Sequence, residues 1–265
     1  MNISFDYYHD GKRKALTMSY DDGQVFDRRL VEIFNKYGIK GTFNLNSGKF
    51  DTEPYVSKEE IKELYRGHEV AVHSLNHPYL TLIPPEELVY QIMEDRKNLE
   101  SLVGYHVRGM AYPYGDYNDI VLNSLTSFGI EYSRTVKSTK SFRIPNNFLE
   151  WHPTCHHDQN LLDKCKEFKN ISEWEQMPLF YVWGHSFEFE RNNNWREIEE
   201  FCKMVAYDES VWYATNIEIM DYVVAMRNLK FSVDRKIVFN PSSIPVWIGV
   251  DGEAMKINPG ERVYL

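Results

Sequence analysis

The sequence predicts an α/β protein of seven or eight parallel strands, arranged as a barrel or as an open doubly wound sheet, with a small antiparallel β appendage at the C-terminus. Short apolar runs alternate with amphipathic helical segments from about residue 14 onward. Polar residues of complementary chemistry follow several of those runs, and both architectures place their ligand site at the carboxyl ends of the strands. The alternating pattern stops at about residue 230.

The elements follow in order from the apolar periodicity and from capping signals. The first strand ends at an acid pair, and the helix after it is stopped by Gly38. A capping box at residues 57–60 opens the second helix, and Pro84-Pro85 opens the third. The expected strands are residues 15–20, 41–45, 69–72 and 106–112, and those near 130–136, 149–153, 178–184 and 211–215. The later helices are expected near residues 117–128, 158–168, 194–206 and 217–228.

Two domains are predicted, a barrel or sheet domain over residues 1–229 and a β-rich appendage over residues 230–265. Short alternating runs in the appendage are separated by turn signals such as Asp251-Gly252, which is typical of antiparallel hairpins. This segment carries no cluster of titratable residues. We therefore expect it to serve packing or an interface rather than chemistry.

The composition narrows the classes of partner. A formal net charge of -9 argues against a nucleic-acid backbone or an anionic membrane as the main partner. The 3 cysteines (Cys155, Cys165 and Cys202) form no paired motif, so neither a disulfide framework nor a thiolate zinc site is predicted. The N-terminal residues have no apolar core of signal-peptide length, and no apolar run is long enough to cross a bilayer. A cytoplasmic location is expected.

The strongest chemical signal combines Asp21-Asp22, after the first strand, with His73 and His77, which follow the third. One carboxylate and two imidazoles are a ligand set that leaves a divalent metal an open position for water or substrate. The second acid is then close enough to remove a proton from that water, and Asp21 is the candidate base. Alone, Asp-Asp-Gly is more often a simple turn, and His-x-x-x-His is ambiguous.

Five ordered segments together resemble the NodB-like polysaccharide deacetylases, a carbohydrate esterase family, over roughly residues 14–220. Four of them are Asp21-Asp22-Gly23 with Ser19-Tyr20 before it, Gly67-His68-Glu69, His73-Ser74-Leu75-Asn76-His77, and Arg108 with Tyr112-Pro113-Tyr114-Gly115. The fifth is His185. The histidine segment is the most specific of them.

The resemblance implies a distorted (β/α) barrel and metal-dependent hydrolysis of an N- or O-acetyl group on a sugar, with N-acetyl favoured. In this role a metal-activated water attacks the acetyl carbonyl, and Zn²⁺ is the ion expected. The implied metal ligands are Asp22, His73 and His77. The implied catalytic residues are Asp21 as base, Arg108 as the residue that orients it, the Tyr114 backbone amide at the oxyanion, and His185 as acid. The implied partner is an acetylated carbohydrate.

Other interpretations stay open at this stage. The same ligands suit a ferrous oxygenase, although such enzymes usually have antiparallel β barrels. A sugar-binding protein without catalysis is another alternative. His152, His156 and His157 are either ligands of a second metal or pocket and surface residues, and the sequence favours the latter. Specificity is assigned to rim loops at residues 46–56, 138–148 and 186–194, and homo-oligomerisation is left open.

Overall fold

The computed structural model describes residues 1–172 and 174–265, and its centre is an eight-stranded sheet. The strands run in the order β6-β5-β4-β3-β2-β8-β7, with β9 also paired to β2, and every pairing in this sheet is parallel. The predicted α/β class with parallel strands is confirmed. The strands are β2 (Lys14–Asp22), β3 (Gly41–Leu45), β4 (Glu69–Val72), β5 (Gly109–Ala111), β6 (Tyr132–Arg134), β7 (Cys155–His156), β8 (Leu179–Gly184) and β9 (Val211–Tyr213).

The sheet is curled, as a distorted (β/α) barrel requires. β2 pairs with β8 along one edge, whereas its other edge is shared by β9 at Lys14–Leu16 and by β3 from Met18 onward. A parallel bridge between Arg134 and Trp151 connects the β6 edge to the segment that leads into β7. Seven consecutive residues of β2 are buried, although the polar residues Thr17, Ser19 and Asp21 alternate with apolar ones, so both faces of this strand are covered by the protein.

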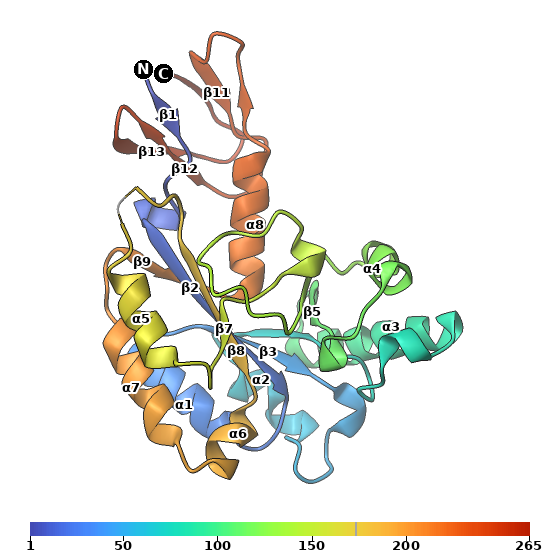
Figure 1. Cartoon of the computed structure of the whole chain (residues 1–265). Coiled ribbons are helices and arrows are strands. Elements are labelled where there is room, and N and C mark those ends of the chain that lie inside the picture. Colours follow the sequence, from blue (N-terminus) through green and yellow to red (C-terminus); the bar gives the residue numbers. More distant parts are fainter. Residues whose placement is uncertain (173) are drawn as a thin grey trace.

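Within the described residues, seven α-helices lie between strands of this sheet, and an eighth, α8, leads from β9 to the C-terminal region (Figure 1). The predicted capping box at Ser57 and Glu60 is present, although it opens a single 3₁₀ turn before α2. Each longer crossover helix packs against the sheet through its apolar face. In α1, Leu30 and Phe34 are buried on that face. The helices are α1 (Asp27–Tyr37), α2 (Ile61–Leu64), α3 (Pro85–Val103), α4 (Asp119–Leu125), α5 (Leu161–Lys169), α6 (Ser186–Arg191), α7 (Trp195–Val205) and α8 (Asn216–Arg227).

Two sequence expectations about local structure are wrong. Residues 149–153 were expected to form a strand, but Phe148–Glu150 is a 3₁₀ turn and the strand β7 lies at Cys155–His156. The apolar residues of this segment, Phe148 and Trp151, pack edge to face on each other instead of alternating across a sheet. The expected rim loop at residues 186–194 contains helix α6, which His185 and Glu188 cap.

The C-terminal region forms two three-stranded antiparallel sheets at the end of α8 (Figure 1). The N-terminal strand β1 (Ile3–Ser4) pairs with β12, so both ends of the chain lie in this region. The predicted antiparallel character is confirmed, while the domain division at residue 230 stays a prediction. The other strands are β10 (Lys230–Phe231), β11 (Ile237–Phe239), β12 (Val246–Val250), β13 (Glu253–Ile257) and β14 (Arg262–Tyr264).

Across the described part of the chain, none of the helices combines the length and the apolar character needed to cross a membrane.

Candidate metal and catalytic site

The polar residues singled out from the sequence gather at the carboxyl ends of the parallel strands. Asp21 and Asp22 end β2, His73 directly follows β4, and His185 directly follows β8. All parallel strands of a barrel point to one rim, so residues distant in sequence are brought together there. The structure therefore places the base, acid and ligand candidates in one cluster, and adds Arg134 at the end of β6.

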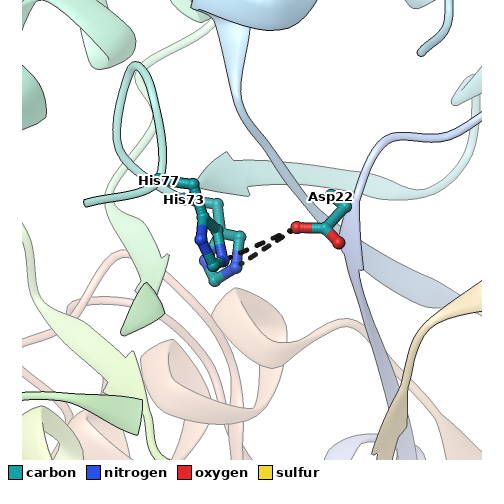
Figure 2. A group of neighbouring side chains, drawn as sticks. All are labelled: Asp22, His73 and His77. Atoms are coloured by element: carbon teal, nitrogen blue, oxygen red, sulfur yellow. Dashed lines mark ion pairs between the residues drawn. The ribbon is translucent and has the colours of Figure 1, made fainter. Parts of the chain in front are cut away.

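Asp22, His73 and His77 face one another closely enough to share one ion (Figure 2). Asp22 Oδ1 lies 3.8 Å from His73 Nε2 and 3.7 Å from His77 Nε2. The same oxygen is buried and has no hydrogen-bond partner among the described residues. A buried carboxylate oxygen without a donor is costly unless a cation fills the gap, so this donor set fits a divalent metal.

The orientation of His73 is fixed from behind. Its Nδ1 lies 2.8 Å from the carbonyl oxygen of Ala111, so the Nδ1 proton is donated there and the lone pair of Nε2 faces Asp22. Burial lowers the pKa of His73 to about 4, and burial together with the neighbouring His73 lowers the pKa of His77 to about 4. Both imidazoles are therefore neutral near pH 7, the form that binds metals.

The loop that carries the two histidines is held in an uncommon backbone conformation. Ser74 and His77 both have positive φ, at 63° and 62°, and Asp22 has φ 80°. Residues other than glycine rarely have positive φ, so contacts with surrounding residues must maintain this conformation. Asn46 supplies such contacts, because its Nδ2 donates to the carbonyl oxygens of His73 and Ser74 at 2.5 and 2.8 Å.

Asp21 is held separately from the ligand cluster by two donors. Its Oδ2 accepts a charged hydrogen bond from Arg134 Nη2, and its Oδ1 accepts from Asn44 Nδ2 at 2.8 Å. Burial acts to raise the pKa of Asp21, but the charge of Arg134, the neighbouring histidines and the Asn44 hydrogen bond outweigh it and leave the pKa below its ordinary value. Asp21 is thus a carboxylate in position to accept a proton.

The prediction that Arg108 orients Asp21 is wrong. Arg108 forms a two-pronged ion pair with Asp221, through Nη1 at 3.0 Å and Nη2 at 2.5 Å, and a further contact with Glu131 at 2.8 Å. It precedes β5, at the opposite end of the strand from the rim. The arginine that contacts Asp21 is Arg134, which is completely buried, with Trp183 packed on its guanidinium 4.3 Å away.

Sequence reasoning missed Arg134, although one signal was available. This residue lies inside the predicted strand at residues 130–136, where a charged side chain is out of place unless it has a buried partner. It is the last residue of β6, so it reaches the same rim as Asp21. A charge at the carboxyl end of a buried parallel strand was the available indication.

His185 connects the site to helix α6. Its Nε2 lies 3.9 Å from Asp21 Oδ2, and its Nδ1 lies 3.3 Å from Glu188 Oε2. Burial acts to lower the pKa of His185, but the Glu188 carboxylate beside Nδ1 and the nearby charges of Asp21 and Asp22 outweigh it and raise the pKa above its ordinary value. Glu188, which sequence reasoning also missed, is therefore the carboxylate that supports the candidate acid.

Tyr114 lies beside the ligand cluster with a positive φ of 59°. Its ring contacts the ring of His77 edge to face at 4.4 Å and stacks on Tyr79 at 4.0 Å. Tyr114 and Tyr79 are about half exposed, so the two rings form an apolar platform at the rim next to His77. The role of the Tyr114 amide stays a prediction.

His152, His156 and His157, the three other histidines considered as metal ligands, divide into two groups. His152 Nδ1 lies 2.6 Å from Thr135 Oγ1, away from the others, which agrees with a structural role. His156 and His157 both turn toward Glu188. His156, His157 and Glu188 each offer a donor atom within 4.8 Å of the others, so a second metal site stays open beside the pocket or surface role expected from the sequence.

The fold and the site define an α/β protein with a candidate metal site, formed by one acid and two histidines, at the rim of a parallel-stranded barrel. The model of the family described as polysaccharide deacetylase matches residues 8–133, and the resemblance seen in the motifs is confirmed. The relatives include the peptidoglycan-N-acetylglucosamine deacetylase PgdA of Listeria monocytogenes, which is 28% identical over 114 residues, 42% of this chain and 24% of that protein. The match thus spans about a quarter of that relative's length.

Solved structures share the fold at low sequence identity. A putative polysaccharide deacetylase from Mycobacterium smegmatis superposes with a TM-score of 0.64 at 18% identity, over 86% of this chain and 96% of that one. A CE4-family pseudoenzyme from Bacillus anthracis gives a TM-score of 0.51 at 17% identity, over 80% and 66% of the two chains. The distorted (β/α) barrel is confirmed, whereas the fold alone is shared by proteins with and without activity.

Proposed function

We propose that this protein is a metal-dependent carbohydrate deacetylase that hydrolyses the acetyl group, N-acetyl rather than O-acetyl, of a sugar, oligosaccharide or polysaccharide. The observation that carries the proposal is the division of labour between two adjacent acids. Asp22 presents a free oxygen to His73 and His77, while Asp21 is held by Arg134 and Asn44. Metal binding alone requires only Asp22 and the two histidines. Hydrolysis also requires a proton acceptor next to the metal, and Asp21 has that position.

Asp22, His73 and His77 are the residues that would hold the cation, and Zn²⁺ suits their two nitrogens and one oxygen. When bound there, the ion lowers the pKa of water and polarises a carbonyl oxygen. Asp21 accepts the proton of the attacking water as the new C–O bond forms, and Arg134 holds its carboxylate in place. His185 gives a proton to the departing amine nitrogen as the C–N bond breaks, and Glu188 holds the imidazole.

The substrate proposal rests on a relative and on the rim. The Listeria relative is named for N-acetylglucosamine in peptidoglycan, which favours an N-acetylated sugar here as well. The stacked Tyr79 and Tyr114 rings beside His77 offer the flat apolar surface on which a sugar ring packs. The cytoplasmic location stays a prediction, and the chain length of the substrate and the oligomeric state stay open.

Replacing Asp21 by Asn tests the proposal. We expect acetate release from an N-acetylglucosamine oligomer to fall by about 10²–10⁴-fold, because the general base is lost, while bound metal is retained. Glu69→Gln is the matched control, since it removes another buried carboxyl at the far end of the barrel. A rate near wild type in Asp21→Asn contradicts the assignment. Sugar binding without acetate release from N- and O-acetyl sugars would instead indicate a carbohydrate-binding protein.

A further inference from the structure

We propose that His156, His157 and Glu188 form a second divalent-cation site, separate from the one at Asp22, His73 and His77. The two histidines come from β7 and the residue after it, and the glutamate comes from α6. The proposal concerns ion binding and does not depend on the hydrolytic function. It follows from three independent features of the cluster.

The spacing of the donor atoms is the first feature. Glu188 Oε2 lies 3.1 Å from His156 Nε2 and 3.3 Å from His157 Nε2, and the three donor atoms lie within 4.8 Å of one another. Ligands held at about 2.0–2.1 Å from a tetrahedral ion lie roughly 3.4 Å apart. The two distances from Glu188 to the histidine nitrogens are therefore already close to the separation that such an ion requires.

The crowding on one carboxylate oxygen is the second feature. Besides the two imidazoles, Glu188 Oε2 has His185 Nδ1 and the His185 backbone nitrogen at 3.3 Å each. A carboxylate oxygen offers about two lone-pair sites, so four nitrogens cannot all donate to it with good geometry. A cation shared by the oxygen and the imidazoles of His156 and His157 removes this conflict, and His185 keeps its contact.

The support behind the imidazoles is the third feature. His156 Nδ1 lies 2.6 Å from Asp158 Oδ1, which is the carboxylate-histidine arrangement that turns the opposite nitrogen toward a metal. The ring of His157 is stacked between Phe189, at 4.1 Å, and Tyr20, at 5.7 Å. Gly184 is required beside it, because a Cβ at that position would lie 2.0 Å from His157 Nδ1. The donors are thus held in place before an ion arrives.

The donor chemistry selects the class of ion. Two imidazole nitrogens and one carboxylate oxygen suit Zn²⁺, Co²⁺ and similar transition ions, whereas Ca²⁺ and Mg²⁺ require mostly oxygen ligands. The site is largely closed, since the side chains of His156 and Glu188 are 10% and 14% exposed. Three protein ligands leave a fourth position for water or for an exogenous group.

Metal titration of the chelator-treated full chain tests the proposal, with Zn²⁺ followed by calorimetry and Co²⁺ by its visible absorption. We expect two equivalents for the wild type and one for each of His156→Gln and Asp22→Ala. His152→Gln is the matched control, because this histidine lies on the same segment outside the cluster, and it should keep two. Asp158→Asn should weaken the second equivalent by about 10–100-fold.

Two outcomes would overturn the second site. One is a single equivalent in the wild type that Asp22→Ala removes. The other is a second equivalent that neither His156→Gln nor Asp158→Asn weakens, which would mean adventitious surface binding. If His156→Gln fails to fold, Asp158→Asn alone decides, since that side chain is 59% exposed. A single wild-type equivalent that His156→Gln removes and Asp22→Ala does not would support this site and contradict the metal site of the proposed function.

Discussion

Buried ionisable groups occur at both ends of this barrel, and the two ends satisfy them differently. At the amino-terminal end, the Glu69 carboxylate accepts hydrogen bonds from Thr42 Oγ1 at 2.8 Å, Tyr132 OH at 2.7 Å and the Ile217 amide at 2.9 Å. At the carboxyl-terminal rim, Asp22 Oδ1 is equally inaccessible but has no donor among the described residues. One group is complete within the protein, and the other needs a ligand.

This difference distinguishes a buried polar group that stabilises the fold from a buried polar group that is available to bind a ligand. Glu69 ties β3, β4 and β6 to the start of α8 without any cation, so it fixes how the strands close around the core. The rim cluster includes three residues with positive φ, Asp22, Ser74 and His77, whose conformation other side chains must maintain. Backbone strain together with an unpartnered acid marks the end of the barrel that binds something.

The largest expected effect on stability comes from Arg134→Met. This change leaves the buried Asp21 carboxylate without its counter-charge, which should lower the free energy of unfolding by about 3–5 kcal/mol. Activity should also fall, by about 10–100-fold, as is typical for a supporting residue. Denaturant unfolding and acetate release measure the two effects.

Arg108→Met is the control for that prediction. Arg108 is partly exposed and pairs with Asp221 and Glu131, so its removal should cost no more than about 1 kcal/mol and leave activity unchanged. A loss of activity in Arg108→Met with normal activity in Arg134→Met would reverse the assignment made from the structure.

A pH effect on stability should distinguish Glu69→Gln. Burial raises the pKa of Glu69 from its ordinary 4.5 to about 7, against three hydrogen bonds that lower it. The folded state therefore holds this proton more tightly than the unfolded state, and its contribution to stability is complete below pH 4.5 and is lost as the pH rises through about 7. That contribution is on the order of 3 kcal/mol.

The variant should lack this part of the pH dependence, so wild type and Glu69→Gln should diverge progressively in thermal unfolding between about pH 4.5 and pH 7. Parallel unfolding curves over that range would show that Glu69 stays ionised and that its three donors, not burial, dominate.

A smaller effect on stability than that of Arg134→Met is expected at the junction with the β appendage. Tyr222 OH donates to the Tyr7 carbonyl at 2.9 Å and accepts from the Trp247 amide at 3.0 Å, so one hydroxyl connects α8 to the N-terminal segment and to β12. Tyr222→Phe should lower the free energy of unfolding by about 1–3 kcal/mol, because two backbone groups lose their partner. Catalytic rate should not change. A loss of activity would mean that the appendage acts on the rim.

The sequence was sufficient where the evidence was local. The apolar run of β2 ends directly at Asp21 and Asp22, and the run of β4 ends at His73, so strand ends and ligand types could be read together. Arg134 and Glu188 could not be assigned in this way, because their contacts depend on how the barrel curls. Arg134 and Asp21 are separated by 113 residues, and no local pattern records that pairing.

A second limit was the length of an element. Helix α6 has only 6 residues, too few for a clear amphipathic period, so residues 186–194 were expected to be a loop and Glu188 had no position. In that helix, Glu188 contacts His156, His157 and His185. The sequence alone could not indicate these contacts, because it did not predict the helix that positions Glu188.

Anomalous X-ray diffraction from crystals grown with Zn²⁺ is the most direct test of the central claim. We expect a strong peak at the rim, within about 2.0–2.2 Å of Asp22 Oδ1 and of Nε2 of both His73 and His77, with Asp21 outside the bonding distance. Absence of a peak at these three atoms, or a peak bound by Asp21 in place of Asp22, would contradict it.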